Sequence, residues 1–187
     1  MSEITPLYVA TRTAWRMWLQ ENFTTEKEVW LVYPKKATGK PRIQYNDAVE
    51  EALCFGWIDS IIKSLDQDHS MQRFTPRKSK NYSQPNKERL RWLADQKMIH
   101  PTLQPEVQRV LSEEFIFPTD ILEAIRKDST AWDNYQLFSD AYRRIRIAYI
   151  DSARRRPEEF DKRLTNFIDK TRKNQLIAGY GGIDKYY

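Results

Sequence analysis

The alternation of apolar and polar positions predicts a helix and then a strand near the start of the chain. Trp15, Trp18 and Leu19 stand at i, i+3 and i+4, so they share one face of a helix over residues 14–22. The segment EVWLVYPKK, residues 28–36, is rich in β-branched and aromatic side chains, which favours a strand. A turn-rich loop follows this strand.

A second helix is predicted over YNDAVEEALCFGW, residues 45–57. Val49, Ala52 and Leu53 form an apolar stripe at helical spacing. Gly56 stands where a helix-ending glycine is expected.

Two strands are predicted next, over WIDSIIKSL (57–65) and SMQRFTP (70–76). Side chains along a strand alternate between its two faces, so Asp59 is expected on the same face as Trp57. The cross-strand register cannot be derived from one sequence, so the partner of Arg73 on the second strand stays open.

From Ser83 onward the spacing of apolar residues is helical almost to the end, and GYGGIDKYY is expected to fray. The predicted fold class is therefore α+β: a small antiparallel or mixed sheet with packed helices, followed by a mostly helical C-terminal half. We predict an α+β core over residues 1–117 that carries the candidate binding site, and a helical C-terminal subdomain over 118–187.

The composition indicates a folded chain with a modest preference for anionic partners. Of the 187 residues 40% are hydrophobic, and the net charge is +5, with the basic excess in the middle and at the C-terminal end. No apolar run approaches the roughly 20 residues of a membrane helix. The N-terminus does not resemble a signal peptide, so we expect a cytoplasmic location without membrane insertion.

Cysteine and histidine are too sparse for the usual metal sites. Cys54 is the single cysteine, and His69 and His100 have no helical-spaced partner. We expect Cys54 to be a buried structural residue, because the C-terminal end of a helix does not lower a thiol pKa. No metal and no cofactor is expected.

A basic stretch interleaved with aromatic residues carries the candidate chemistry. RFTPRKSKNYSQPNKERLRWL, residues 73–93, holds seven Arg and Lys residues against one acid. Arginine forks bind carboxylate or phosphate in two-point geometry, and backbone N–H groups at a helix start add to an anion site. The candidate ligand-binding residues are Trp57, Asp59, Arg73, Phe74, Arg77, Tyr82, Ser83 and Asn86.

In this hypothesis Arg73 and Arg77 point into one concave site shared with Asp59. The ligand would be a small anion or the acidic surface of a partner protein. The alternative is structural: Asp59 pairs with Arg73 or Arg77 as a plain ion pair, and Ser83 only caps a helix.

Two other functions stay open. Residues 73–91, together with the arginines at 143–146 and 154–156, could bind nucleic-acid phosphates, although no nucleic-acid-binding motif is present. A metal-free enzyme with Asp59 as its base is the third possibility, and no catalytic motif supports it.

Several motifs resemble one known family. YNDAVEEALCFGWIDS, RFTPRK and NYSQPNKERLRWL occur in the order and spacing of the YdeI/OmpD-associated family, also called bacteriocin-protection proteins. RIRIAYIDSARRRPEEFDKRLTNFIDKTRKN resembles the helical C-terminal domain of that family, and Tyr82 stands where the family pattern has Trp. The resemblance implies a bacterial protein involved in bacteriocin protection or stress tolerance, and it implies no known reaction.

Overall fold

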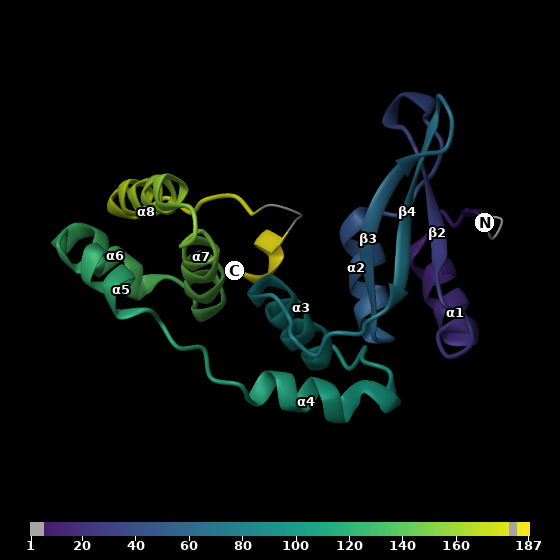
Figure 1. Ribbon diagram of the computed structural model, residues 1–187, viewed down its shortest axis with the longest axis horizontal. Coiled ribbons are helices and arrows are strands. Elements are labelled where there is room, and N and C mark those ends of the chain that lie inside the picture. The colour runs from purple at the N-terminus through teal and green to yellow at the C-terminus, as the bar shows by residue number, and fades with distance from the viewer. Residues whose placement is uncertain (1–5, 180–182) are drawn as a thin grey trace. The chain divides into compact units, whose positions relative to one another are not determined.

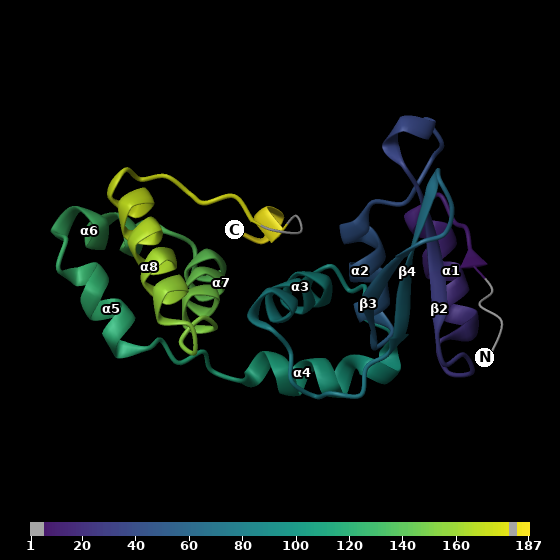
Figure 2. The same ribbon diagram turned by 45° about the horizontal axis from the view of Figure 1, so that its top comes forward.

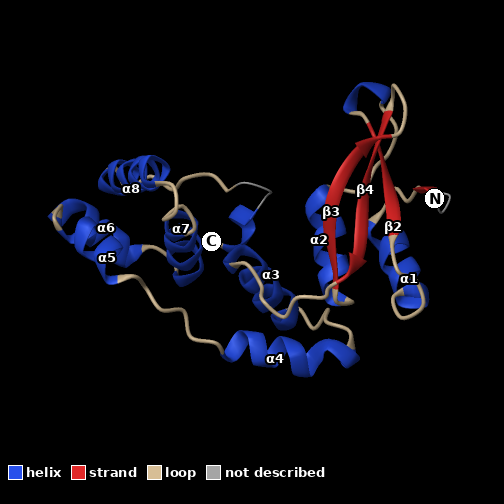
Figure 3. Cartoon of the chain, viewed as in Figure 1, coloured by secondary structure: helices blue, strands red, loops and turns tan. Residues whose placement is uncertain are grey.

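A computed structural model describes residues 6–179 and 183–187 and divides the chain into two compact units. Unit 1 comprises Met1–Tyr82 and Leu90–Val110, and unit 2 comprises Ser83–Arg89 and Leu111–Tyr187. The predicted α+β class is confirmed (Figure 3). The division into an α+β core over residues 1–117 and a helical subdomain over residues 118–187 stays a prediction.

Unit 1 is built on a mixed sheet. Its strands are β1 (Pro6–Leu7), β2 (Val29–Pro34), β3 (Trp57–Ser64) and β4 (His69–Pro76), and within the described residues their order is β1-β2-β4-β3 (Figure 1). β1 runs parallel to β2, and the other pairs are antiparallel. The hairpin predicted over residues 57–76 is therefore present.

Two helices, α1 (Arg12–Asn22) and α2 (Tyr45–Cys54), pack against one face of this sheet (Figure 1). Thr11 caps α1 by accepting a hydrogen bond from the backbone N–H of Ala14 at 3.1 Å. Gly56 ends the second helix with φ of 72°, a conformation that glycine adopts without steric cost.

The aromatic side chains of α1 meet the inner face of the sheet. Trp15 stacks on Trp18, and the centres of the Trp15 and Phe74 rings are 5.4 Å apart. Trp15 Nε1 also donates to the Ala48 carbonyl at 3.0 Å. Trp15, Phe74 and Trp57 are all buried. The core of unit 1 is thus an aromatic layer between α1, α2 and the sheet.

The register of the hairpin shifts between Asp59 and Ile62. Asp59 lies opposite Phe74, and after the shift Ile62 lies opposite Gln72. Such an irregularity adds a residue to one strand, so strict alternation along β3 is wrong beyond Asp59.

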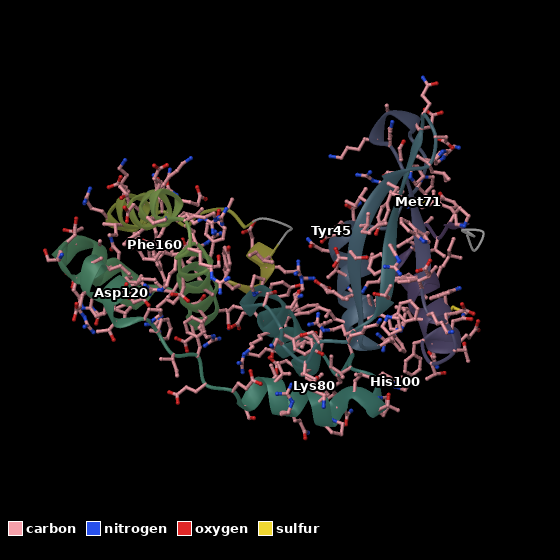
Figure 4. The ribbon with its side chains drawn as sticks, in the orientation of Figure 1. Tyr45, Met71, Lys80, His100, Asp120 and Phe160 are labelled. Atoms are coloured by element: carbon pink, nitrogen blue, oxygen red, sulfur yellow. The ribbon has the colours of Figure 1, made fainter. Side chains whose placement is uncertain are left out.

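Helix α3 (Gln84–Asp95) begins in unit 2 and continues in unit 1, and α4 (Gln104–Ser112) follows it. Unit 2 also holds α5 (Thr119–Arg126), α6 (Ser129–Leu137), α7 (Asp140–Asp151) and α8 (Pro157–Arg172), whose arrangement Figure 2 shows. Its core contains the buried residues Ile121, Ile125, Ala131, Tyr135, Tyr142, Ile147, Ile150 and Phe167. Phe160 on α8, labelled in Figure 4, packs against this core.

The predicted fraying of the C-terminus is wrong for the residues that the structure describes there. Ile183 and Tyr186 are buried in a short 3-10 helix, Ile183–Tyr186. Residues 180–182 of that predicted tail lie outside the described residues. Among the described helices, none combines the length and the apolar character that a bilayer crossing demands.

Candidate functional site

Arg73 and Arg77 line the same hollow of unit 1. The hollow has a volume of about 910 Å³ and lies between the segment that follows α1 and the end of β4. We call it the Arg77 hollow. Its cationic residues are Lys27, Arg73, Arg77 and Lys78, its acidic residues are Glu26 and Glu28, and its hydroxyl residues are Thr24, Thr25, Thr75 and Ser79.

Neighbouring groups hold Arg77 in one position. Its backbone N–H donates to the Gly56 carbonyl at 2.8 Å, and its Nη2 donates to the Asn81 carbonyl at 2.6 Å. The guanidinium carbon lies 4.0 Å from the centre of the Tyr82 ring. Stacking and hydrogen bonding order a guanidinium before any ligand arrives, which lowers the entropic cost of binding.

Arg73 is already paired within the protein. It donates from Nε to Glu28 Oε2 at 2.8 Å, and its Nη2 contacts the same oxygen. The hydrogen bonds from Arg73 and Trp30 hold the pKa of the Glu28 carboxyl below its usual value. Arg73 therefore contributes less free positive charge to the hollow than Arg77 does.

Asp59 does not line the hollow with the two arginines. Its side chain faces α2, whereas the side chain of Arg73 faces the opposite side of the sheet. Asp59 Oδ2 accepts hydrogen bonds from Tyr45 Oη at 2.9 Å and from Gln72 Nε2 at 2.7 Å. Figure 4 shows Tyr45 beside β3. The hypothesis that Asp59 shares a site with both arginines is therefore wrong. The alternative, an ion pair between Asp59 and either arginine, is wrong as well, because Arg73 pairs with Glu28 and Arg77 bonds the Asn81 carbonyl.

The aromatic residues predicted to floor the site have other positions. Trp57 and Phe74 are 1% and 0% exposed, so both belong to the core. The Tyr82 ring stacks against the Arg77 guanidinium, and Tyr82 is not among the residues that line the hollow.

Ser83 and Asn86 belong to unit 2 and are described there. Ser83 precedes α3, and its carbonyl accepts from the Lys87 N–H at 3.0 Å. Asn86 Oδ1 accepts from Arg89 Nη1 at 2.9 Å within the same helix. Their predicted part in ligand binding stays a prediction.

Sequence reasoning did not single out the segment TTEKE, residues 24–28, which forms one wall of the hollow. The partner of Arg73 comes from this segment, because Arg73 lies opposite Trp30 in the sheet. The sequence signal that could have identified this partner was Glu28, an acidic residue two positions before Trp30 of β2. That signal could be interpreted only once the register of β2 against β4 was known, because the register places Arg73 opposite Trp30.

Cys54 is buried, as predicted. Burial raises the pKa of its thiol to about 12, so the reactive thiolate is scarce at neutral pH. The structure thus gives Cys54 a structural position.

We expect protein purified without added metal to contain no tightly bound transition metal, because one buried thiol and two separate histidines cannot form a zinc site. No group of three or more potential ligands is gathered in the part of the chain that the structure describes. Elemental analysis checks this expectation, and stoichiometric zinc would contradict it.

Two family models match separate parts of the chain. Residues 7–106 match the family model described as a domain of unknown function (DUF8412), and this match covers more than half of the chain. The chain belongs to the DUF8412 family. The Arg77 hollow lies wholly within the DUF8412 match.

Residues 114–174 match a second family model, described as bacteriocin-protection, YdeI or OmpD-associated. The resemblance noted in the sequence is confirmed over these residues. The N-terminal motifs of that resemblance lie within residues 7–106, which match DUF8412. The match to the YdeI/OmpD-associated family therefore covers a smaller part of the chain than the sequence motifs suggested. Searches of curated proteins and of solved structures found no match.

Proposed function

We propose that the protein binds a small anionic ligand in the Arg77 hollow. The observation that carries the proposal is the convergence of four cationic side chains on one hollow that contains two carboxylates. Phosphate and carboxylate groups are the ligands that guanidinium and ammonium groups bind through charge-assisted hydrogen bonds.

Arg77 is the group best suited to contact the ligand. Its Nη2 is held by the Asn81 carbonyl, and its Nε is buried without an acceptor. An unsatisfied buried donor carries a free-energy penalty that a ligand oxygen can relieve. Lys27 and Lys78 add charge at the exposed rim, and the hydroxyls of Thr75 and Ser79 supply neutral hydrogen-bonding groups.

The arginines of unit 2 support this function over nucleic-acid binding. Arg143 pairs with Asp140, Arg144 with Glu88, and Arg154 with Asp120 and Asp151. These internal ion pairs reduce the positive charge that Arg143, Arg144 and Arg154 can offer to the phosphates of a nucleic acid.

We also propose, from the match over residues 114–174, that ligand binding serves a role in bacteriocin protection in the cytoplasm. The binding of an anion and the role in bacteriocin protection are two separate proposals, and each can be tested without the other. Loss of protection in cells that produce Arg77→Ala in place of the natural protein would link the two.

Arg77→Ala is expected to weaken the binding of a small anion by roughly 10- to 100-fold, because it removes charge-assisted hydrogen bonds worth about 1.5–3 kcal/mol. Arg77→Lys should restore the affinity only in part, since an ammonium group cannot reproduce the fork or its stacking on Tyr82. Isothermal titration with inorganic phosphate, pyrophosphate and succinate measures both effects.

Lys36→Ala is the matched control, because Lys36 is an exposed cation of unit 1 that lies outside the hollow. It removes the same charge and should leave the affinity nearly unchanged. Equal loss of binding in Arg77→Ala and Lys36→Ala would indicate a general charge effect and refute the site. Tight, salt-dependent binding of a duplex or single-stranded oligonucleotide would favour the nucleic-acid alternative.

A further inference from the structure

A second cavity lies within unit 2, between α7, α8 and the C-terminal segment. Its volume is about 630 Å³, within the range of small-molecule sites. Most of its wall is apolar and comes from Ile145, Ile150, Phe167, Ile177 and Ile183. We call it the Arg146 cavity after the cation in its wall.

Arg146 is a buried cation, with 7% of its surface exposed. Its Nη2 donates to the carbonyls of Ile177 at 2.6 Å and Ala178 at 2.9 Å, and it also contacts the Tyr187 hydroxyl. These partners are neutral, and no carboxylate pairs with Arg146 among the described residues. Its Nε is buried without any acceptor.

A buried charge without a counter-charge is costly, and folded proteins normally pair it. The one carboxylate that lines the cavity is Glu159, which is bound by Arg163 Nε at 2.7 Å. Arg163 in turn lies 3.7 Å from the centre of the Tyr149 ring and donates to the Tyr149 carbonyl. The negative charge that Arg146 lacks is therefore not supplied by the cavity's own acid.

The side of the cavity formed by α8 also carries positive charge. Lys162 and Asn166 line the cavity and are exposed to solvent, so they stand at its edge. Arg146, Lys162 and Arg163 outnumber Glu159, which leaves an excess of two positive charges around an apolar interior. This combination fits a molecule with an apolar body and one anionic group.

We propose that the Arg146 cavity binds a small amphipathic carboxylate, with its apolar part against the isoleucines and Phe167 and its carboxylate paired with Arg146. Burial of the apolar part contributes the hydrophobic free energy, and the carboxylate satisfies the guanidinium. The site is separate from the Arg77 hollow: it lies in another unit and selects a different class of ligand.

The test uses the full chain and three probes: decanoate, the matched neutral alcohol 1-decanol, and acetate. Decanoate should bind at least tenfold more tightly than 1-decanol, and acetate should show no measurable binding because it lacks the apolar body. Isothermal titration gives the affinities, and amide chemical-shift changes locate the bound probe. Equal affinity for decanoate and 1-decanol, or shifts outside the cavity residues, would overturn the proposal.

Two variants on α8 test the location without touching the core. Asn166→Trp places a large ring at the edge of the cavity and should lower decanoate affinity at least tenfold. Thr165→Trp is the control, because Thr165 is the exposed neighbour of Asn166 and does not line the cavity. An equal affinity in the two variants would contradict the assignment.

Arg146→Met tests the charge directly. If it folds, the preference for decanoate over 1-decanol should fall to about one, while binding of 1-decanol persists. A preference retained in Arg146→Met would remove Arg146 from the site. If the variant does not fold, because Arg146 also holds Ile177 and Ala178, Asn166→Trp and the comparison of probes still decide the matter.

Discussion

Trp57→Ala is expected to lower the free energy of unfolding of unit 1 by about 3–5 kcal/mol, the usual cost of removing a fully buried large aromatic side chain. Trp57 is 1% exposed and lies edge-on to Trp18 with ring centres 5.9 Å apart. Its Nε1 also donates to the Phe23 carbonyl at 3.1 Å. The substitution therefore leaves both a cavity and an unpaired carbonyl.

Urea denaturation followed by tryptophan fluorescence measures this loss. Every tryptophan except Trp132 lies in unit 1, so fluorescence reports mainly on that unit. Trp57→Phe keeps most of the apolar volume and should cost about 1–2 kcal/mol less than the alanine variant.

Met17→Ala on the exposed side of α1 is the control, and its effect should stay within about 0.5 kcal/mol. An unchanged midpoint for Trp57→Ala would show that the ring is not part of a tightly packed core.

Arg12→Met should destabilise unit 1 by about 3–5 kcal/mol, because it removes charge-assisted hydrogen bonds to two buried carboxylates. Glu50 and Glu51 on α2 are 0% and 1% exposed. Arg12 Nη1 donates to Glu50 at 2.8 Å and to Asp47 at 3.1 Å, and its Nε donates to Glu51 at 2.5 Å. One guanidinium thus joins α1 to three acids on α2.

Arg16 supports the same carboxylate, since its Nη1 donates to Glu51 Oε2 at 2.7 Å. Its Nη2 donates to the Met98 carbonyl at 2.8 Å, so the network also reaches the chain beyond α3. Loss of Arg16 alone should cost less than loss of Arg12, because Arg12 then still bonds Glu50, Glu51 and Asp47.

A double-mutant cycle measures the coupling. Arg12→Met and Glu51→Gln should together cost clearly less than the sum of the single changes, because either change alone already removes the direct ion pair between the two residues. Arg42→Met, at a half-buried arginine that donates to the Pro34 carbonyl, is the matched control with an expected effect of about 1 kcal/mol. Strict additivity in the cycle would show that the two residues are not energetically linked.

Local patterns predicted most elements of unit 1. Apolar spacing and the cap of α1 act over a few residues, so the helices, the hairpin and the role of Gly56 could be predicted from the sequence. Burial of Cys54 and Trp57 followed from the same patterns.

The candidate site could be predicted only in part. Arg73 and Arg77 come from one short stretch, so their common location depends on local geometry alone. The partner of Asp59 could not be predicted, because the register between β3 and β4 shifts by a bulge that no residue in the sequence announces. That register decides which side of the sheet a carboxylate faces, and here it separates Asp59 from both arginines.

What the sequence determined by itself is the α+β class, the helical C-terminal part and the basic stretch that contains Arg77. The tertiary structure alone decided which charges are neutralised and which stay available. Glu28 pairs with Arg73 across 45 positions of sequence, and Glu88 pairs with Arg144 across 56. The physical reason is that electrostatic energies depend on distance and burial in space, and both arise only when segments far apart in the sequence pack together.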